Sequence, residues 1–296
     1  AMRVAILAKA RDDRAEVAAR AVVTWLQSAG HEVALEASLA SRVQISGGIA
    51  RDELAQDAEM AIALGGDGTM LQAARTFSPA GVPILGVNVG RLGFLTDTGP
   101  EGMLDVLASV FAGDYTIQER LMLTGEVHRA GQVVGGPFAA LNDIVVNKGE
   151  LAQVVRLESW VDGSFVSEYN ADGLIFSTPT GSTAYALSAG GPVITPDCPV
   201  LQLIPIAPHS LASRALVFSD SEPVTIFPAT PERLMMVVDG SAGCYVWPED
   251  RVLIRRCEQP ARFVRLADHE FFRVLGEKLG WGLPHVAKPG TLPMAS

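Results

Sequence analysis

Asp67 lies among small residues at the point where a buried strand is predicted to end and a helix to begin. The apolar run Met60–Leu64 indicates the strand. The small residues around the aspartate are Gly65, Gly66, Gly68 and Thr69. Glycines let a backbone come close to a ligand, and the N-terminus of a helix offers N–H groups and positive partial charge to phosphate oxygens. We therefore predict that these four residues form a phosphate-binding loop.

Taken alone, Asp67 has two interpretations. An aspartate at this place commonly caps the helix that follows it. A carboxylate beside a phosphate-binding loop can instead accept a hydroxyl proton or hold Mg²⁺. The loop fits neither the Walker A pattern nor G-x-G-x-x-G, so it leaves both interpretations open.

A second polar segment runs from Asp172 to Tyr185. It contains five serine or threonine residues between Ser177 and Thr183, and Gly190-Gly191 follows it. A helix cap would explain one of these hydroxyls but not the others. Hydroxyls and exposed N–H groups suit ribose and phosphate oxygens, and we expect the ring of Tyr185 to stack on a base.

Together these stretches resemble the NAD kinase family, and the resemblance covers most of the chain. The matching motifs, in chain order, are Gly65–Thr69, Gly90–Thr96, the pair Asn142-Asp143, Asp172–Pro196 and Pro208–Val217. The long fourth segment is the most distinctive, because lipid kinases and phosphofructokinases share the glycine-rich motif. The pair Asn142-Asp143 by itself indicates only a turn.

The resemblance implies an enzyme, a phosphotransferase that moves the γ-phosphoryl group of ATP to the 2′-hydroxyl of the adenosine ribose of NAD and forms NADP. It implies that Asp67 accepts the proton and that the glycine-rich loop holds the ATP phosphates. The implied NAD-binding residues are Asp67, Gly68, Asn142, Asp143, Asp172, Thr183, Ala184, Tyr185, Ala186, Leu187 and Ser188. A divalent cation, Mg²⁺ or Mn²⁺, is the implied cofactor, without protein ligands assigned to it. Homo-oligomers, dimers or tetramers, are implied as well.

Three positions depart from the family pattern. Asp143 stands where relatives carry the longer glutamate, Ser241 follows Asp239-Gly240 where glutamine is frequent, and Asn170 stands where some relatives have arginine or lysine. The shorter acid leaves the partner of Asp143 open. Ser241 is left outside the predicted site, and Asn170 cannot supply the charge of the residue it replaces.

Two other functions share features with this one. A lipid or sugar kinase could carry the same glycine-rich motif, but the segment Asp172–Tyr185 argues against it. A catalytically idle regulator could bind a dinucleotide, but it would have no need of Asp67 beside a phosphate ester. An assay with ATP, Mg²⁺ and NAD separates all three.

The elements that must position these loops fall into two groups. Up to residue 114, strands alternate with helices, which indicates a doubly wound, Rossmann-like α/β domain whose ligands bind beyond the carboxyl ends of parallel strands. The expected strands are Arg3–Ala8, Glu32–Glu36, Met60–Leu64 and Pro83–Asn88. The expected helices are Asp12–Ala29, one from about Gly68, and Glu101–Ala112.

Residues 115–267 read as an antiparallel, sandwich-like all-β domain that binds NAD. Short alternating runs dominate it, and Asp162-Gly163 predicts a hairpin turn. The expected strands are Leu121–His128, Ile144–Asn147, Val154–Val161, Phe165–Tyr169, Leu174–Ser177, Val224–Phe227, Leu234–Val238, Arg251–Arg255 and Arg262–Leu266. A last helix, capped by Asp268 and ended by Gly280, is expected to pack back on the first domain, so that residues 268–296 return to it.

The composition of the chain argues against several kinds of binding partner. The 296 residues carry a net charge of −10 without a basic run, so nucleic acid is not an expected partner. Apolar runs are too short for a membrane helix, and the chain does not open with a secretory leader, so we expect a cytoplasmic protein away from membranes. The cysteines Cys198, Cys244 and Cys257 are far apart, which argues against disulfides and zinc.

Overall fold

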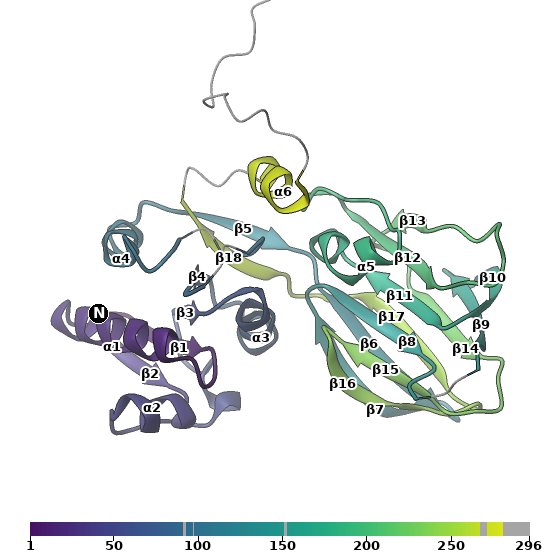
Figure 1. The fold of residues 1–296 in the computed structure, drawn as a ribbon. Helices are drawn as coiled ribbons and strands as arrows, with labels where there is room; N and C mark the ends of the chain where they lie inside the picture. Colours follow the sequence, from purple (N-terminus) through teal and green to yellow (C-terminus); the bar gives the residue numbers. More distant parts are fainter. Residues whose placement is uncertain (91–92, 97, 151–152, 267–270, 281–296) are drawn as a thin grey trace, which may run out of the picture.

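The computed structural model describes residues 1–90, 93–96, 98–150, 153–266 and 271–280. These residues form three six-stranded sheets, one in an N-terminal α/β part and two in a C-terminal β part (Figure 1). The predicted fold class, an α/β domain followed by an antiparallel β domain, is confirmed.

The first sheet has the strand order β2-β1-β3-β4-β18-β5. Its four N-terminal strands are β1 (Arg3–Ala8), β2 (Glu32–Leu35), β3 (Met60–Leu64) and β4 (Ile84–Val87), and they are parallel. The helices of this part are α1 (Asp13–Ser28), α2 (Ala37–Val43), α3 (Asp67–Phe77) and α4 (Met103–Phe111). Successive residues of β1 face opposite layers: Val4 packs in one core with residues of α1, α2 and α4, and Ala5 packs in another with residues of α3. Helices therefore cover both faces, as a doubly wound sheet requires.

The second part is a stack of two antiparallel sheets with a shared apolar core. One sheet, in the order β10-β9-β14-β17-β6-β7, comprises β6 (Leu123–Arg129), β7 (Gln132–Ala140), β9 (Val155–Val161), β10 (Ser164–Ala171), β14 (Val224–Pro228) and β17 (Arg251–Arg256). The other, in the order β13-β12-β11-β8-β15-β16, comprises β8 (Asp143–Asn147), β11 (Gly173–Ser177), β12 (Val200–Ile206), β13 (Leu216–Ser219), β15 (Leu234–Val238) and β16 (Ser241–Val246). The predicted hairpin joins β9 to β10, and Asp162 and Gly163 have the positive φ angles of 46° and 74° that such a tight turn needs.

One strand lies in a different sheet from the one expected. The run expected at Arg262–Leu266 in the β domain is β18 (Ala261–Arg265), which pairs parallel with β4 and antiparallel with β5 (Thr116–Arg120) in the first sheet. Its successive residues Phe263 and Val264 point to opposite faces of the sheet and pack into the two cores of the α/β part. A period of two predicts a strand but not the sheet that it joins. The division of the chain at residues 114/115 and 267/268 stays a prediction.

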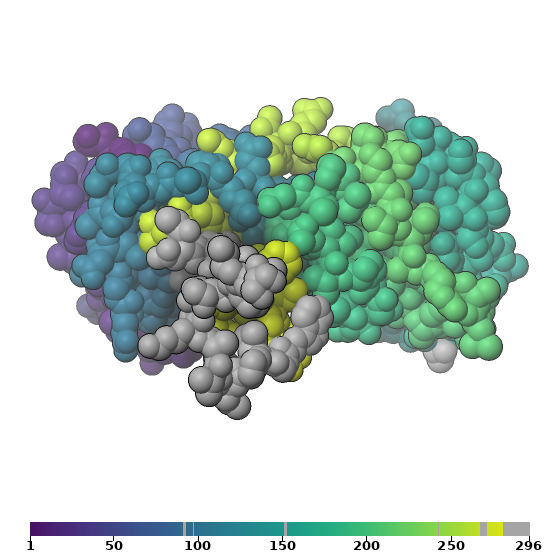
Figure 2. All heavy atoms as spheres, turned by 90° about the horizontal axis from the view of Figure 1, so that it is seen from above, coloured from purple at the N-terminus to yellow at the C-terminus, as the bar shows by residue number. Residues whose placement is uncertain are grey.

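The C-terminal helix α6 (Phe271–Leu279) lies at the junction of the two parts, where Figure 2 shows it in yellow between them. The Nζ of Lys278 is 5.7 Å from the ring centroid of Phe94. Phe271 shares a cavity wall with Gln118 of β5 and Thr195 of the β part. The helix thus lies beside both the first sheet and the second part. Its predicted cap, Asp268, and residues 281–296 lie outside the described residues.

Candidate functional site

The three glycines of the glycine-rich loop have two different roles. Gly65 is required by the packing of the loop, whereas Gly66 and Gly68 leave space beside it. Gly66 is the N-cap of α3, and Asp67 is its first residue. A Cβ on Gly65 would lie 2.0 Å from Oγ1 of Thr69, so Gly65 allows the loop to fold against the helix. A Cβ on Gly66 or Gly68 would have no atom within 4 Å. These two glycines therefore border open space, as a loop that receives a ligand should.

The Asp67 carboxylate is fixed by a neighbouring loop. Its Oδ2 accepts the backbone N–H of Phe94 and its Oδ1 accepts that of Leu95, both at 3.1 Å. The N-cap of α3 is Gly66, and the Asp67 carboxylate bonds to residues outside this helix, so Asp67 is not its cap. An ionised carboxylate has about four acceptor positions, so both oxygens can still accept a hydrogen bond from a ligand.

The hydroxyl-rich segment uses its hydroxyls within the protein. The Thr178 hydroxyl donates to the Leu141 carbonyl at 2.6 Å, and the Ser182 hydroxyl donates to the carbonyl of Pro179 at 2.7 Å. The other three, on Ser177, Thr180 and Thr183, also have hydrogen-bond partners in the protein. These hydroxyls therefore have a structural role that our interpretation did not include: Thr178 ties the segment to Leu141, and most of the others bond within the segment. Their contacts with ribose and phosphate stay a prediction.

A cavity of about 330 Å³ gathers several of the predicted residues. Four of them line it: Asn142, Asp143, Ala184 and Tyr185. Leu71 of α3 lines it too, and Leu71 follows Asp67 by four residues, so both lie on one face of the helix. The cavity is thus bounded by the helix that begins at Asp67 and by strands β8 and β15 of the β part with the turns beside them.

The remaining predicted residues do not line this cavity. Ala186 is buried in a small core with Val145 and Ile204. The Asp172 carboxylate is 2.7 Å from Nζ of Lys148. Thr183, Leu187 and Ser188 belong to the turn and short helix around Tyr185, which are η3 (Thr180–Thr183) and α5 (Tyr185–Ser188). Their predicted contacts with NAD, and that of Gly68, stay predictions.

Asp239 is the site residue that sequence reasoning missed. Its side chain is fully buried and accepts the backbone N–H groups of Leu141, Asn142 and Asp143 at 3.0, 2.8 and 3.1 Å. Arg75 of α3 approaches the same carboxylate at 3.7 Å. In the sequence, Asp239-Gly240 is an ordinary turn signal, and nothing in it indicates a partner almost a hundred residues away.

Asp143 and Asp239 face the cavity as a pair of buried carboxyl groups. Burial, with the Asp239 charge as a second cause, raises the pKa of Asp143 to about 7. Burial also raises the pKa of Asp239, while its three backbone donors and Arg75 act in the opposite direction. The three N–H groups that point at Asp239 favour its ionised form, and Asp143 has no such donors among the causes of its shift. Asp143 then carries a proton up to about neutral pH and can donate a hydrogen bond.

Protein groups alone do not build a metal cage here. In the parts of the chain that the structure describes, His, Cys, Asp and Glu nowhere gather in a group of three or more that could hold an ion. Kinases commonly bind Mg²⁺ through one or two carboxylates together with substrate phosphates. The single carboxylate of Asp67 beside an open loop fits that mode.

Models of known protein families match both parts of the chain. The model of the ATP-NAD kinase N-terminal domain matches residues 4–115, and that of the C-terminal domain matches residues 141–266. The chain belongs to the ATP-NAD kinase family. The resemblance seen in the motifs is thereby confirmed, and the chain is a phosphotransferase of this family.

Individual relatives support the same assignment. The "NAD kinase 2" of one strain of Prochlorococcus marinus is 61% identical over 231 residues, which are 78% of this chain and 76% of that protein. The "NAD kinase 2" of Parasynechococcus marenigrum is 62% identical over 230 residues, again 78% and 76% of the two chains. These matches favour an NAD kinase over a lipid or sugar kinase and over an idle regulator.

Two solved structures share the fold. A yeast NADH kinase complexed with NADH superimposes with a TM-score of 0.88 at 23% identity, covering 98% of this chain and 90% of that one. An NAD kinase from Archaeoglobus fulgidus in complex with ATP gives a TM-score of 0.73 at 27% identity, with 94% and 99% covered. Among the described residues, every helix is too short or too polar to cross a membrane.

Proposed function

We propose that this family member binds NAD in the cavity of Asn142, Asp143 and Tyr185, and that Asp67 accepts the proton of the 2′-hydroxyl as the γ-phosphoryl group of ATP moves to it. The observation that carries the proposal is the position of Asp67. It heads the helix whose Leu71 lines this cavity, and two backbone N–H groups hold its carboxylate in one orientation.

The step conserves atoms and charge in a simple way. The 2′-oxygen forms a bond to the γ-phosphorus of ATP, and the bond from that phosphorus to the β,γ-bridging oxygen breaks, which releases ADP. The hydroxyl proton passes to the Asp67 carboxylate and later to solvent. Positioning and charge stabilisation supply most of the catalysis in phosphoryl transfer, so the rigid seat of Asp67 and the open glycine loop are the features that the reaction needs.

The cavity proposed to bind NAD contains side chains that can contact the base and side chains that can bond to ribose or amide oxygens. The ring of Tyr185 is 46% exposed at the cavity wall and is free to stack on a base. Asn142 and the protonated Asp143 supply donors and acceptors for ribose or amide oxygens. Asp239 holds the backbone of both residues in place.

Mg²⁺ or Mn²⁺ is part of the proposal as the cofactor, and so are a cytoplasmic location and a homo-oligomer. When bound with ATP, the cation would neutralise phosphate charge and would meet the Asp67 carboxylate. The β part offers edges for assembly, because β13 and β16 end one sheet, and β13 exposes Val217. A tetramer is our preferred state, and light scattering that finds an active monomer would contradict it.

The test is direct formation of NADP. ATP, NAD and Mg²⁺ or Mn²⁺ are mixed with the protein, and NADP is detected with an NADP-specific dehydrogenase. We expect NADP to accumulate, and its absence with both metals would overturn the proposal. Repeating the assay with polyphosphate in place of ATP, and with NADH in place of NAD, defines the donor and the acceptor.

A further inference from the structure

Three neighbouring parallel strands end side by side at the carboxyl edge of the first sheet. Ala8 of β1 pairs with Leu64 of β3, and Leu64 pairs with Val87 of β4. Two backbone hydrogen bonds continue this register. The backbone N–H of Lys9 donates to the Leu64 carbonyl at 2.8 Å, and the backbone N–H of Gly65 donates to the Val87 carbonyl at 2.9 Å. Lys9 and the residues after Val87 therefore flank the glycine-rich loop on either side.

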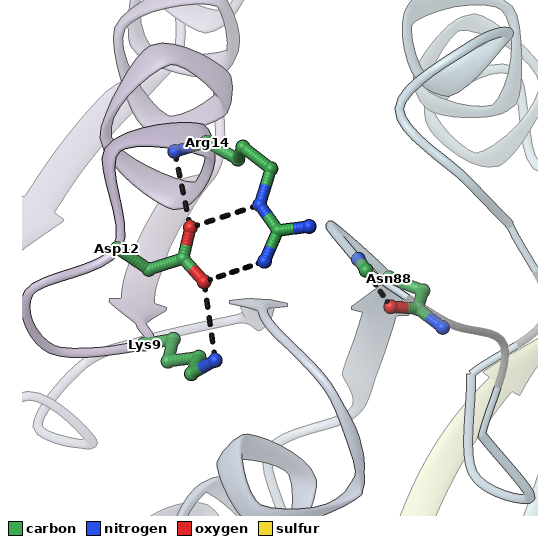
Figure 3. Close-up of polar contacts among 5 residues, drawn as sticks. Lys9, Asp12, Arg14 and Asn88 are labelled. Atoms are coloured by element: carbon green, nitrogen blue, oxygen red, sulfur yellow. Dashed lines mark hydrogen bonds and ion pairs between the residues drawn. The ribbon is translucent and has the colours of Figure 1, made fainter.

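Two cations sit at this edge on a single carboxylate. Asp12 accepts Nζ of Lys9 and Nη2 of Arg14, each at 3.1 Å, and Figure 3 shows both side chains converging on it. The exposed fractions differ sharply: 9% for the Asp12 side chain, but 54% for Lys9 and 65% for Arg14. Hydrogen bonds from these two residues hold the pKa of Asp12 well below its usual range, so it stays ionised. The trio presents two cations to solvent and carries one positive charge in excess.

The guanidinium of Arg14 reaches toward the next loop. A Cβ on Gly90 would lie 3.8 Å from both of its terminal nitrogens, and Gly90 itself donates to Oδ1 of Asn88 at 2.7 Å. In Figure 3 the guanidinium points across the edge toward Asn88. Arg14 thus faces the loop that follows β4, and the backbone of Lys9 lies beside the end of β3, where the glycine-rich loop begins.

Helix capping does not account for this arrangement. Asp12 caps α1 by accepting the backbone N–H of Arg14, and that bond needs neither cationic side chain. Arg14 lies in the first turn of α1, where a cation is unfavourable with the positive end of the helix dipole, and Lys9 lies three residues before the cap. Two cations held there, in a chain with a net charge of −10, indicate an anionic ligand.

We propose that Lys9 and Arg14 form a subsite for the polyphosphate chain of the phosphoryl donor, with Asp12 holding both cations in position. The inference rests on the proposed function, because it assumes that the open space beside Gly66 and Gly68 receives the donor. Neither cation lines the cavity of Tyr185, so this subsite serves the donor and not the dinucleotide. Recognition is of the phosphates alone, so inorganic tripolyphosphate should bind there as well.

The test measures binding and turnover in matched variants. Lys9→Met and Arg14→Met, singly and together, keep the aliphatic stems and remove the charges. Arg20→Met is the control. Arg20 belongs to the same helix, but its guanidinium contacts the Arg42 carbonyl and not Asp12. Calorimetry gives the dissociation constants of a non-hydrolysable ATP analogue and of tripolyphosphate, and initial rates give the KM values for ATP and for NAD.

We expect each single variant to weaken binding of the ATP analogue about tenfold and the double variant about 100-fold, as charge-assisted hydrogen bonds to phosphate would. Tripolyphosphate binding should weaken in parallel, while the KM for NAD and all constants of Arg20→Met stay within about twofold of wild type. An unchanged analogue affinity in the double variant would overturn the subsite. A larger rise in the KM for NAD than for ATP would also overturn it, because the cations would then serve the acceptor. Absence of NADP formation by the wild-type protein would contradict the proposed function instead, and the calorimetry would still decide the subsite.

Discussion

The Asp67 carboxylate occupies the space that a side chain at Gly93 would fill. A Cβ on Gly93 would lie 2.0 Å from Oδ1 of Asp67 and 2.6 Å from its Cγ. The next two residues, Phe94 and Leu95, donate their backbone N–H groups to the same carboxylate. The second glycine of the motif Gly90–Thr96 therefore exists to admit Asp67, and the two motifs form one structure.

Gly93→Ala should disable the enzyme through this contact. The added methyl cannot coexist with the carboxylate, so Asp67 must move, and a misplacement of about 1 Å typically costs about 100-fold in rate. We expect kcat to fall by about that factor, with a smaller change in the KM for NAD. Gly99→Ala is the matched control, because a Cβ there meets nothing within 4 Å. Equal kcat values for the two variants would show that the seat of Asp67 does not matter.

Asp67→Asn should reduce kcat by about 10²–10⁴-fold, the usual cost of losing a general base. The structure adds a second expectation. Asn has one acceptor oxygen, so it cannot satisfy both Phe94 and Leu95, and an N–H left without its acceptor costs about 1–3 kcal/mol of stability. Steady-state kinetics and thermal melting, with NAD binding as a control, measure both effects. A kcat within about tenfold of wild type, equivalent to roughly 1.4 kcal/mol, would remove Asp67 from the chemistry.

Asp143 should make stability depend on pH between about 4 and 7. Its pKa is raised from 3.8 to about 7, first by burial and then by Asp239. In this window the unfolded chain loses the Asp143 proton and the folded protein keeps it, so the free energy of unfolding falls as pH rises and then levels off above pH 7. Asp143→Asn cannot titrate and should lose this slope.

Urea denaturation of wild type and Asp143→Asn at several pH values isolates that effect. We expect the variant to gain stability relative to wild type by a few kcal/mol between pH 4 and pH 8, since each pKa unit is worth about 1.4 kcal/mol. A constant difference between the two proteins across the range would show that Asp143 titrates normally.

Local features of this fold could be predicted from the sequence, but long-range partners could not. The helix predicted at Asp12–Ala29 is α1, Met60–Leu64 is a strand, and Asp162-Gly163 closes a hairpin, because each depends on neighbouring residues. Strand β12 was missed, although it is largely apolar, because a proline and a glutamine interrupt its pattern. The hydrogen-bond partners of Asp67 and Asp239 are brought close only by the fold, so the pattern along one segment of the sequence cannot predict them.

Asp239→Asn should raise the KM for NAD without affecting that for ATP. The fully buried carboxylate holds the N–H groups of Leu141, Asn142 and Asp143, and an amide cannot accept all three. We expect a loss of about 1–3 kcal/mol in stability together with a looser dinucleotide loop. Asp220→Asn is a control for stability alone, because Asp220 is a buried aspartate that pairs with Arg256 away from the cavity. If both variants changed the KM for NAD equally, Asp239 would have only a structural role.

Tyr185 should contribute through its ring and not through its hydroxyl. The side chain is 46% exposed and forms part of the wall of the cavity that also holds Asn142 and Asp143. Tyr185→Phe keeps the ring and should retain most of the activity. Tyr185→Ala removes the stacking surface and should raise the KM for NAD by the equivalent of about 1–3 kcal/mol, the range for base–aromatic stacking.

A second exposed tyrosine provides the control for this experiment. Tyr245 of β16 is 48% exposed and lies under the guanidinium of Arg233, outside the wall of the Tyr185 cavity. Tyr245→Ala removes the same atoms and should leave the KM for NAD within about twofold of wild type, which is below roughly 0.5 kcal/mol. Initial rates at varied NAD and saturating ATP distinguish the three variants. Severe and equal losses in Tyr185→Phe and Tyr185→Ala would assign the role to the hydroxyl, because only that group is absent from both.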